Sequence, residues 1–142
     1  MDLLKNYPFL YIEDPLAQDS WDDWANLTKN ISNQVLVSGD DLTATNPYRL
    51  QMAINKKAAT AIVIKPNQIG TVIESLAVVE MAKAAGFKTI VSHRSGDTND
   101  DFIADLAVGA GADFIKAGSP AKPERMVKYS RLLEIENELN KK

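Results

Sequence analysis

The sequence has no cysteine, one histidine, no basic cluster and no long apolar run. Without cysteine, it has no disulfides, thiolate metal sites or cysteine nucleophiles. No apolar stretch approaches the roughly 18 residues of a membrane span, and the first residues lack a signal-peptide core, so we expect a cytoplasmic protein without a membrane partner. The 16 basic residues are outnumbered by 19 acidic ones and are scattered, which argues against a nucleic-acid partner.

The 142 residues are enough for one ordinary domain, and their pattern is a repeated alternation. Short, nearly continuous apolar runs predict buried parallel strands, and the longer amphipathic segments between them predict helices. Five βα units of an α/β protein with a parallel sheet are therefore expected. The predicted strands are residues 9–12, 35–38, 61–64, 89–92 and 114–115, and the predicted helices are 20–30, 47–57, 71–85, 100–109 and 123–140.

Two helices carry further local signals. Asn46 followed by Pro47 is typical of a helix N-cap with proline at the first helical position. In the last predicted helix, apolar residues at helical spacing predict a buried stripe. That stripe would consist of Met126, Tyr129, Leu132, Leu133 and Leu139.

An ionisable residue ends or follows each predicted strand. These residues are Glu13, Asp40, Lys65, His93 and Lys116, at intervals of 27, 25, 28 and 23 residues, which is one βα unit each time. Because the carboxyl ends of parallel strands lie at one edge of a sheet, we expect these groups to meet there, where α/β proteins build their sites.

Each of these residues also has a structural interpretation. Asp40 could be a turn residue, a single His93 is more often structural than catalytic, and Arg94 with Ser95 could form a polar turn. Lys65 directly follows four apolar residues and is harder to explain in this way, since lysine is rarely buried without a partner. The occurrence of all five groups at one edge favours a functional site.

The residue types at this edge suggest a particular chemistry. Two carboxylates, Glu13 and Asp40, supply the hard oxygen ligands that suit Mg²⁺ better than zinc. Lys65, near other cations, is a candidate general base, and Arg94 with Ser95 can bind a phosphate or carboxylate. A metal, a base and an anion site together suggest proton abstraction beside a carboxylate, with stabilisation of an enolate-like state.

Longer motifs extend over nearly the whole chain, and their order and spacing resemble those of enolase, the phosphopyruvate hydratase of glycolysis. Specific among them are Lys-x-Asn-Gln-Ile-Gly and Ser-His-Arg-Ser-Gly. The motifs are Ile-Glu-Asp-Pro at 12–15, Gly-Asp-Asp-Leu-Thr at 39–43, Lys-Pro-Asn-Gln-Ile-Gly-Thr at 65–71, Ser-His-Arg-Ser-Gly-Asp-Thr at 92–98, Phe-Ile-Ala-Asp-Leu at 102–106, Lys at 116, Gly-Ser-Pro-Ala at 118–121 and Glu-Arg at 124–125.

The resemblance implies the C-terminal part of an enolase-type (βα)8, TIM-like barrel and a Mg²⁺-dependent lyase that interconverts 2-phosphoglycerate and phosphoenolpyruvate. It implies that Glu13 and Asp40 ligate Mg²⁺ and that Lys65 takes the C2 proton. Lys116 would contact the substrate carboxylate and stabilise the intermediate. Substrate would also be bound by Ser92, His93, Arg94 and Ser95, with Arg94 and Ser95 on the phosphate.

Length is the main departure from the family pattern. The resemblance implies that the N-terminal domain and the first part of the barrel lie outside residues 1–142, together with a third metal carboxylate, the glutamate acid and a mobile loop. We therefore expect this chain to be inactive alone, or to need an N-terminal enolase chain or a second copy as partner.

Two alternatives accompany this expectation. The chain could be a non-catalytic enolase remnant that serves as a binding or assembly module. Five βα units would also fit an open, flavodoxin-like sheet such as a response-regulator receiver. A receiver needs aspartate at the end of its third strand, where this chain has Lys65.

Overall fold

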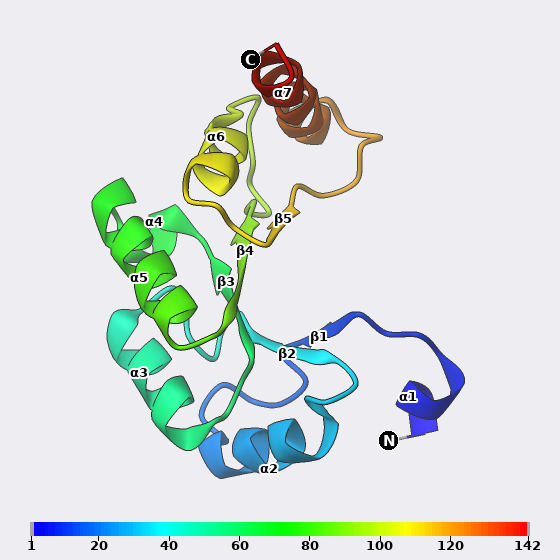
Figure 1. Ribbon diagram of the computed structural model, residues 1–142, viewed down its shortest axis with the longest axis vertical. Helices are drawn as coiled ribbons and strands as arrows, with labels where there is room; N and C mark the ends of the chain where they lie inside the picture. The colour runs from blue at the N-terminus through cyan, green and yellow to red at the C-terminus, as the bar shows by residue number, and fades with distance from the viewer. Residues whose placement is uncertain (1, 142) are drawn as a thin grey trace. The chain divides into compact units, whose positions relative to one another are not determined.

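The structure, a computed structural model, describes residues 2–141, which form two compact units divided between Thr89 and Ile90. Each unit alternates strands and helices (Figure 1). The first contains α1 (Asp2–Asn6), β1 (Tyr11–Glu13), α2 (Trp21–Ile31), β2 (Leu36–Gly39), α3 (Pro47–Lys56), β3 (Ala61–Ile64), α4 (Pro66–Ile69) and α5 (Val72–Ala84). From β4 (Lys88–Ser92), which spans the division, the second continues with α6 (Phe102–Gly109), β5 (Phe114–Lys116) and α7 (Pro123–Leu139).

In the first unit, β2 lies between β1 and β3, and both pairings are parallel. Glu13 is opposite Ser38, and Gly39 is opposite Ile62. Helix α3 lies between α2 and α5 and packs against both (Figure 1). A flavodoxin-like sheet would place β1 between β2 and β3, so that alternative is wrong.

The core of the first unit forms around β3, in which all four residues are buried. Continuous burial is typical of a parallel strand that is covered on both faces. Trp24 of α2 is fully buried, and its Nε1 donates to the carbonyl of Ala17 at 3.0 Å. Thr28, one turn later, donates to the carbonyl of Ala58 at 2.7 Å and ties α2 to the segment before β3.

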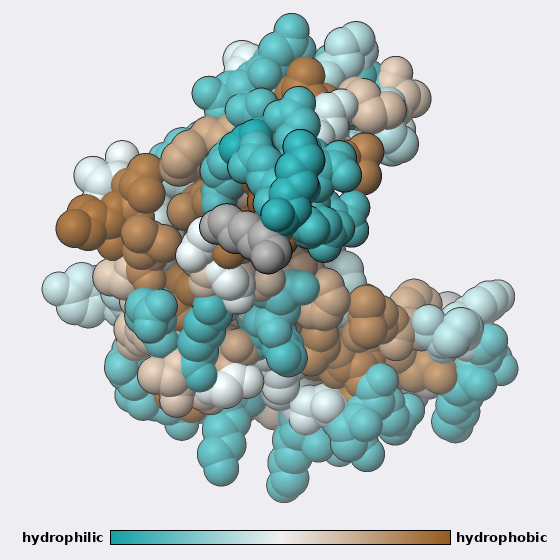
Figure 2. All heavy atoms as spheres, turned by 45° about the horizontal axis from the view of Figure 1, so that its top comes forward, coloured by the Kyte–Doolittle hydropathy of each residue, from teal (hydrophilic) through white to brown (hydrophobic). Residues whose placement is uncertain are grey.

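In the second unit, β4 and β5 are parallel, with Ile90 opposite Phe114 and Ser92 opposite Lys116. Helix α6 packs against α7. Hydrophilic side chains gather over the carboxyl-terminal part of α7 (Figure 2).

The predicted apolar stripe of α7 is wrong at three of its five positions, while Tyr129 and Leu132 are half-buried. Its buried residues are Arg125, Lys128 and Ile135, whereas Met126, Leu133 and Leu139 are exposed. Arg125 and Lys128 occupy the buried face because they bind backbone carbonyls and the Asp97 carboxylate of the loop after β4.

The predicted parallel α/β pattern is confirmed, with boundaries that shift by one or two residues at most ends. Strand β1 begins at Tyr11 rather than at residue 9, since Phe9 and Leu10 are exposed and lie outside the pairing with β2. Helices α1 and α4, with five and four residues, were not predicted because they are too short to show a 3.6-residue period. No helix within residues 2–141 combines the length and apolar character needed to cross a membrane.

Asn46 is the N-cap of α3, and its side chain accepts hydrogen bonds from the amides of Tyr48 and Arg49. We expect Asn46→Ala to lower the free energy of unfolding by about 1 kcal/mol, because two helical amides lose their acceptor. Asn55→Ala, at an exposed position in the same helix, should change it by less than about 0.5 kcal/mol. Urea unfolding measures both. Equal effects would contradict the capping role.

Asp105 of α6 accepts two hydrogen bonds from Arg131 of α7, at 2.8 and 3.0 Å. These bonds, with charge attraction adding to them, lower the pKa of the Asp105 carboxyl below its ordinary value of 3.8, against a smaller opposing effect of desolvation. The folded state therefore gains stability above the unfolded pKa and loses it as pH falls through the lower, folded pKa.

We expect the Tm difference between the parent and Asp105→Asn to shrink as pH falls from about 6 to about 2.5. Thermal unfolding followed by circular dichroism measures it. In an Arg131→Met background the same substitution should show no such trend. A difference that grows toward low pH would contradict the interpretation.

Candidate active site

Three of the predicted site residues lie together at the carboxyl ends of the first unit's strands. Glu13 is the last residue of β1, Asp40 directly follows β2, and Lys65 directly follows β3. The parallel register brings these ends to one edge, as the spacing predicted.

Asp40 and Lys65 form an ion pair, with Lys65 Nζ 2.5 Å from Asp40 Oδ2. Their side chains are only 11% and 15% exposed. The other carboxylate oxygen, Asp40 Oδ1, is buried and has no hydrogen-bond partner among residues 2–141. A buried carboxylate oxygen without a donor is a strong acceptor that remains available to a cation.

Asp14 fixes the backbone at Asp40 through hydrogen bonds. Its two carboxylate oxygens accept from the amides of Asp40 and Asp41, each at 2.9 Å. Its own amide donates to the carbonyl of Ser38 at 3.1 Å. The φ of Asp14 is 42°, in the left-handed region that aspartate tolerates better than most residues. Sequence reasoning missed this role, although the motif Ile-Glu-Asp-Pro contains the residue.

The loop after β2 fixes Lys65 in a similar way. The hydroxyl of Thr45 accepts from the amide of Lys65 and donates to Gln68 Oε1, both at 2.9 Å. Ala44 and Thr45 have φ values of 48° and 54°, so the chain turns sharply there. Sequence reasoning missed Thr45, because nothing in a short polar loop indicates which hydroxyl reaches the next strand.

Tyr11 orients Glu13. Its hydroxyl donates to Glu13 Oε2 at 2.6 Å. Burial raises the pKa of Tyr11 above its ordinary value, and the hydrogen bond to Glu13 with the nearby negative charge of Asp40 raises it further. Tyr11 therefore remains a protonated donor at neutral pH, and it orders one oxygen of the carboxylate.

The other predicted site residues lie in the second unit, also at strand ends. Ser92 ends β4 and Lys116 ends β5, opposite one another in the parallel register. Just beyond them, the amide of His93 donates to the carbonyl of Lys116 at 2.9 Å. Arg94 and Ser95 follow in an exposed loop, where their side chains can reach an anion.

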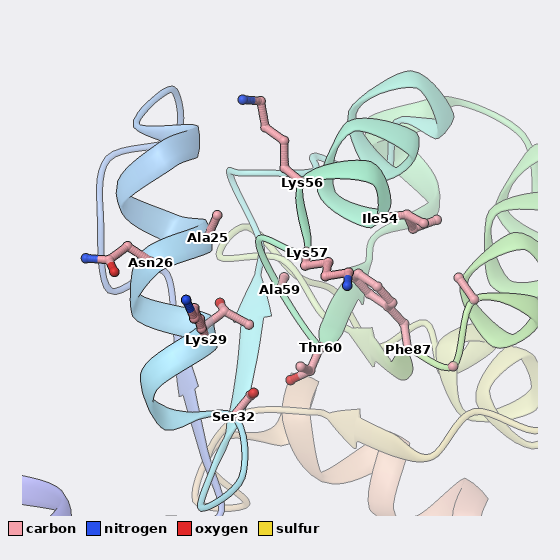
Figure 3. Close-up of a pocket in the computed structure, with 13 residues that line it drawn as sticks. Ala25, Asn26, Lys29, Ser32, Ile54, Lys56, Lys57, Ala59, Thr60 and Phe87 are labelled. Carbon is pink, nitrogen blue, oxygen red and sulfur yellow. The ribbon is translucent and has the colours of Figure 1, made fainter.

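A cavity of about 750 Å³ lies elsewhere in the first unit (Figure 3). Its lining residues come from α2, from the end of α3 and from the segments that precede β3 and β4, so it lies toward the amino ends of the strands and not toward Asp40 and Lys65. Lys56 points away from it, in agreement with its ion pair to Asp22 at 2.7 Å. The cavity therefore has no part in the predicted chemistry.

No group of three His, Cys, Asp or Glu side chains converges within the described part of the chain. The predicted metal ligands Glu13 and Asp40 are two carboxylates at adjoining strand ends, and the unpartnered Oδ1 of Asp40 suits a hard cation. These residues fit Mg²⁺ as a part of its ligand shell.

The comparisons with known proteins agree in pointing to one family. A family model described as "Enolase, C-terminal TIM barrel domain" matches residues 1–142. The chain is 53% identical to the enolase of Elusimicrobium minutum over 98% of its own length and 33% of that protein. It is 52% identical to the enolase of Mycobacterium leprae over 97% of its length and 32% of that protein, and 46% identical to enolase B of Dictyostelium discoideum over 99% and 32%.

The chain thus spans about a third of the length of the curated relatives it matches. The match extends over both units, and it includes the strand ends that carry Glu13, Asp40, Lys65 and Lys116. By sequence along its whole length and by its parallel βα pattern, the chain belongs to the enolase family, in that family's C-terminal TIM barrel domain.

Proposed function

We propose that residues 1–142 carry the C-terminal share of an enolase active site, which reversibly dehydrates 2-phosphoglycerate to phosphoenolpyruvate in glycolysis. One observation supports this most directly. Lys65 Nζ lies 2.5 Å from Asp40 Oδ2 at the ends of adjacent parallel strands, with both side chains largely buried. An amine and a carboxylate with an available oxygen at this edge are the parts that proton abstraction beside a carboxylate requires.

In this proposal Lys65 is the base that takes the C2 proton. Its ammonium donates to Asp40 in the structure, and its amide is held by Thr45, so both ends of the residue are positioned. The ammonium first releases one proton to solvent, and the neutral amine then takes the C2 proton of the substrate, which restores the ammonium. Lys116, at the end of β5, contacts the substrate carboxylate and stabilises the negative charge that develops there.

The loop after β4 supplies the anion site of the proposal. Arg94 and Ser95 bind the phosphate of the three-carbon acid, and Ser92 and His93 complete the substrate-binding segment. Both Arg94 and Ser95 are exposed, as a site that receives a ligand from solvent requires. A guanidinium matches a phosphate through two parallel hydrogen bonds.

Glu13 and Asp40 are the residues that would hold Mg²⁺. Tyr11 orders one oxygen of Glu13, while Asp40 offers its unpartnered Oδ1. When bound, the ion would supply positive charge to the doubly charged, enolate-like state of the substrate.

The remaining groups of the site, among them a third metal carboxylate and the acid that expels hydroxide, would come from outside residues 1–142. They could be supplied by an N-terminal enolase chain or by a second copy, in the cytoplasm where glycolysis takes place. The alternative is a non-catalytic remnant that binds or assembles with another protein, and the same experiment decides between the two.

The test is a chimaera in which these 142 residues replace the matching segment of the Elusimicrobium minutum enolase, to which they are 53% identical. We expect the chimaera to form phosphoenolpyruvate from 2-phosphoglycerate, measured by absorbance, and residues 1–142 alone to form none. Lys65→Ala should lower kcat roughly 10³-fold, because the base is lost.

Lys29→Ala, which removes an exposed lysine of α2, is the matched control and should retain the parent rate. A folded chimaera without activity would support the remnant. Full activity after Lys65→Ala would refute the assignment of the base, and activity of the purified chain alone would refute the division of the site.

A further inference from the structure

Two cations of α7 are buried beneath the proposed substrate-binding loop, and the proposed mechanism does not use them. The side chains of Arg125 and Lys128 are only 9% and 1% exposed. Lysine and arginine are rarely buried without several partners, because desolvation of a charge is costly. Within the described part of the chain, the Arg125 side chain finds its hydrogen-bond partners in residues 93–97.

Arg125 binds both the backbone and the side chains of this loop. Its Nη1 donates to Asp97 Oδ2 at 2.7 Å and to the carbonyl of Arg94 at 2.9 Å, and its Nη2 donates to the carbonyl of Ser95 at 3.3 Å. The guanidinium also contacts Nδ1 of His93. It is the same Nη1, whose two hydrogens already point to Asp97 and to the Arg94 carbonyl, that faces this ring nitrogen. Because arginine cannot accept a hydrogen bond, a proton on Nδ1 would meet a cation without an acceptor, so Nδ1 is the unprotonated ring nitrogen.

Lys128 secures the far side of the same loop. Its Nζ donates to the carbonyl of Thr98 at 2.6 Å and to that of Glu124 at 2.7 Å, and it lies 3.2 Å from Asp97 Oδ1. The carboxylate of Asp97 is therefore shared between Arg125 and Lys128, one oxygen to each. This arrangement fixes the direction in which Arg125 extends.

The segment after β5 packs against the ring of His93. Gly118 has a φ of 79°, and a Cβ on it would lie 2.8 Å from His93 Cε1 and 2.9 Å from Arg125 Cδ. The hydroxyl of Tyr129 donates to the carbonyl of Gly118 at 2.5 Å. Only glycine permits this close approach, so the ring is packed by Gly118 and held at Nδ1 by Arg125.

We propose that Arg125, held by Asp97 and Lys128, is a positioning residue that fixes His93 as the neutral imidazole with its proton on Nε2. Nε2 is then a hydrogen-bond donor for the anion that Arg94 and Ser95 bind. The role of Nε2 in binding rests on the function proposed above. The assignment of the proton to Nε2 rests on the contacts of His93 alone. A free imidazole exchanges between two tautomers, and the contact with Arg125 removes that freedom.

His93 is the only histidine in the sequence, so its ring signals need no assignment. Long-range ¹H–¹⁵N correlation spectra of the full 142-residue chain at about pH 8, where an ordinary imidazole is neutral, should show Nε2 protonated and Nδ1 unprotonated. Arg125→Lys, which keeps the charge but loses the planar fork, should shift both signals toward the averaged values of a tautomer mixture. Arg131→Lys, in the same helix but bonded to Asp105 of α6 and not to the loop, is the matched control and should leave them unchanged.

In the chimaera, Arg125→Lys should lower kcat/KM about 10- to 100-fold, mainly through KM for 2-phosphoglycerate. A tautomer mixture, a protonated Nδ1 or an imidazolium in the parent would overturn the proposal, as would unchanged spectra in folded Arg125→Lys. If that variant does not fold, Asp97→Asn takes its place with the same expected and contradicting spectra. Correct spectra with an inactive parent chimaera would refute the proposed function and leave the tautomer assignment intact.

Discussion

The ion pair between Asp40 and Lys65 is the interaction on which the rest of the site depends. Its two charges are largely withdrawn from water, and the cost of desolvation can equal or exceed their attraction, so the pair is weak evidence of stability. What the ion pair contributes is the placement of its two groups. It holds an amine and a carboxylate in contact at the ends of β2 and β3, and it leaves Asp40 Oδ1 without a partner.

Both units secure their proposed site residues through the backbone of the loops that carry them. In the first unit, Asp14 binds the amide of Asp40, and Thr45 binds that of Lys65. In the second, Arg125 binds the carbonyls of Arg94 and Ser95. The parallel strands bring each side chain to the edge of the sheet, and these bonds fix the backbone from which it extends. A site that stabilises developing charge needs groups that are held in place in this way before the substrate binds.

The parts of the structure that sequence could predict are those encoded locally. The apolar run before Lys65 predicts β3 with its correct ends, and the strand-end positions of Glu13, Asp40 and Lys116 follow from the same alternation. The packing of α7 could not be predicted in this way, because the helical spacing of its apolar residues predicts that its leucines face the core. Arg125 and Lys128 are buried instead through contacts with residues about 30 positions away, which no helical period reveals.

Removal of a proton from carbon by Lys65 is tested most directly by hydrogen exchange. In D₂O, the chimaera should replace the C2 proton of 2-phosphoglycerate with deuterium, followed by ¹H NMR, faster than buffer alone. With Lys65→Ala, exchange should fall to the rate in buffer, while the Lys29→Ala chimaera should exchange like the parent. Exchange at the parent rate without Lys65 would contradict the role assigned to this lysine.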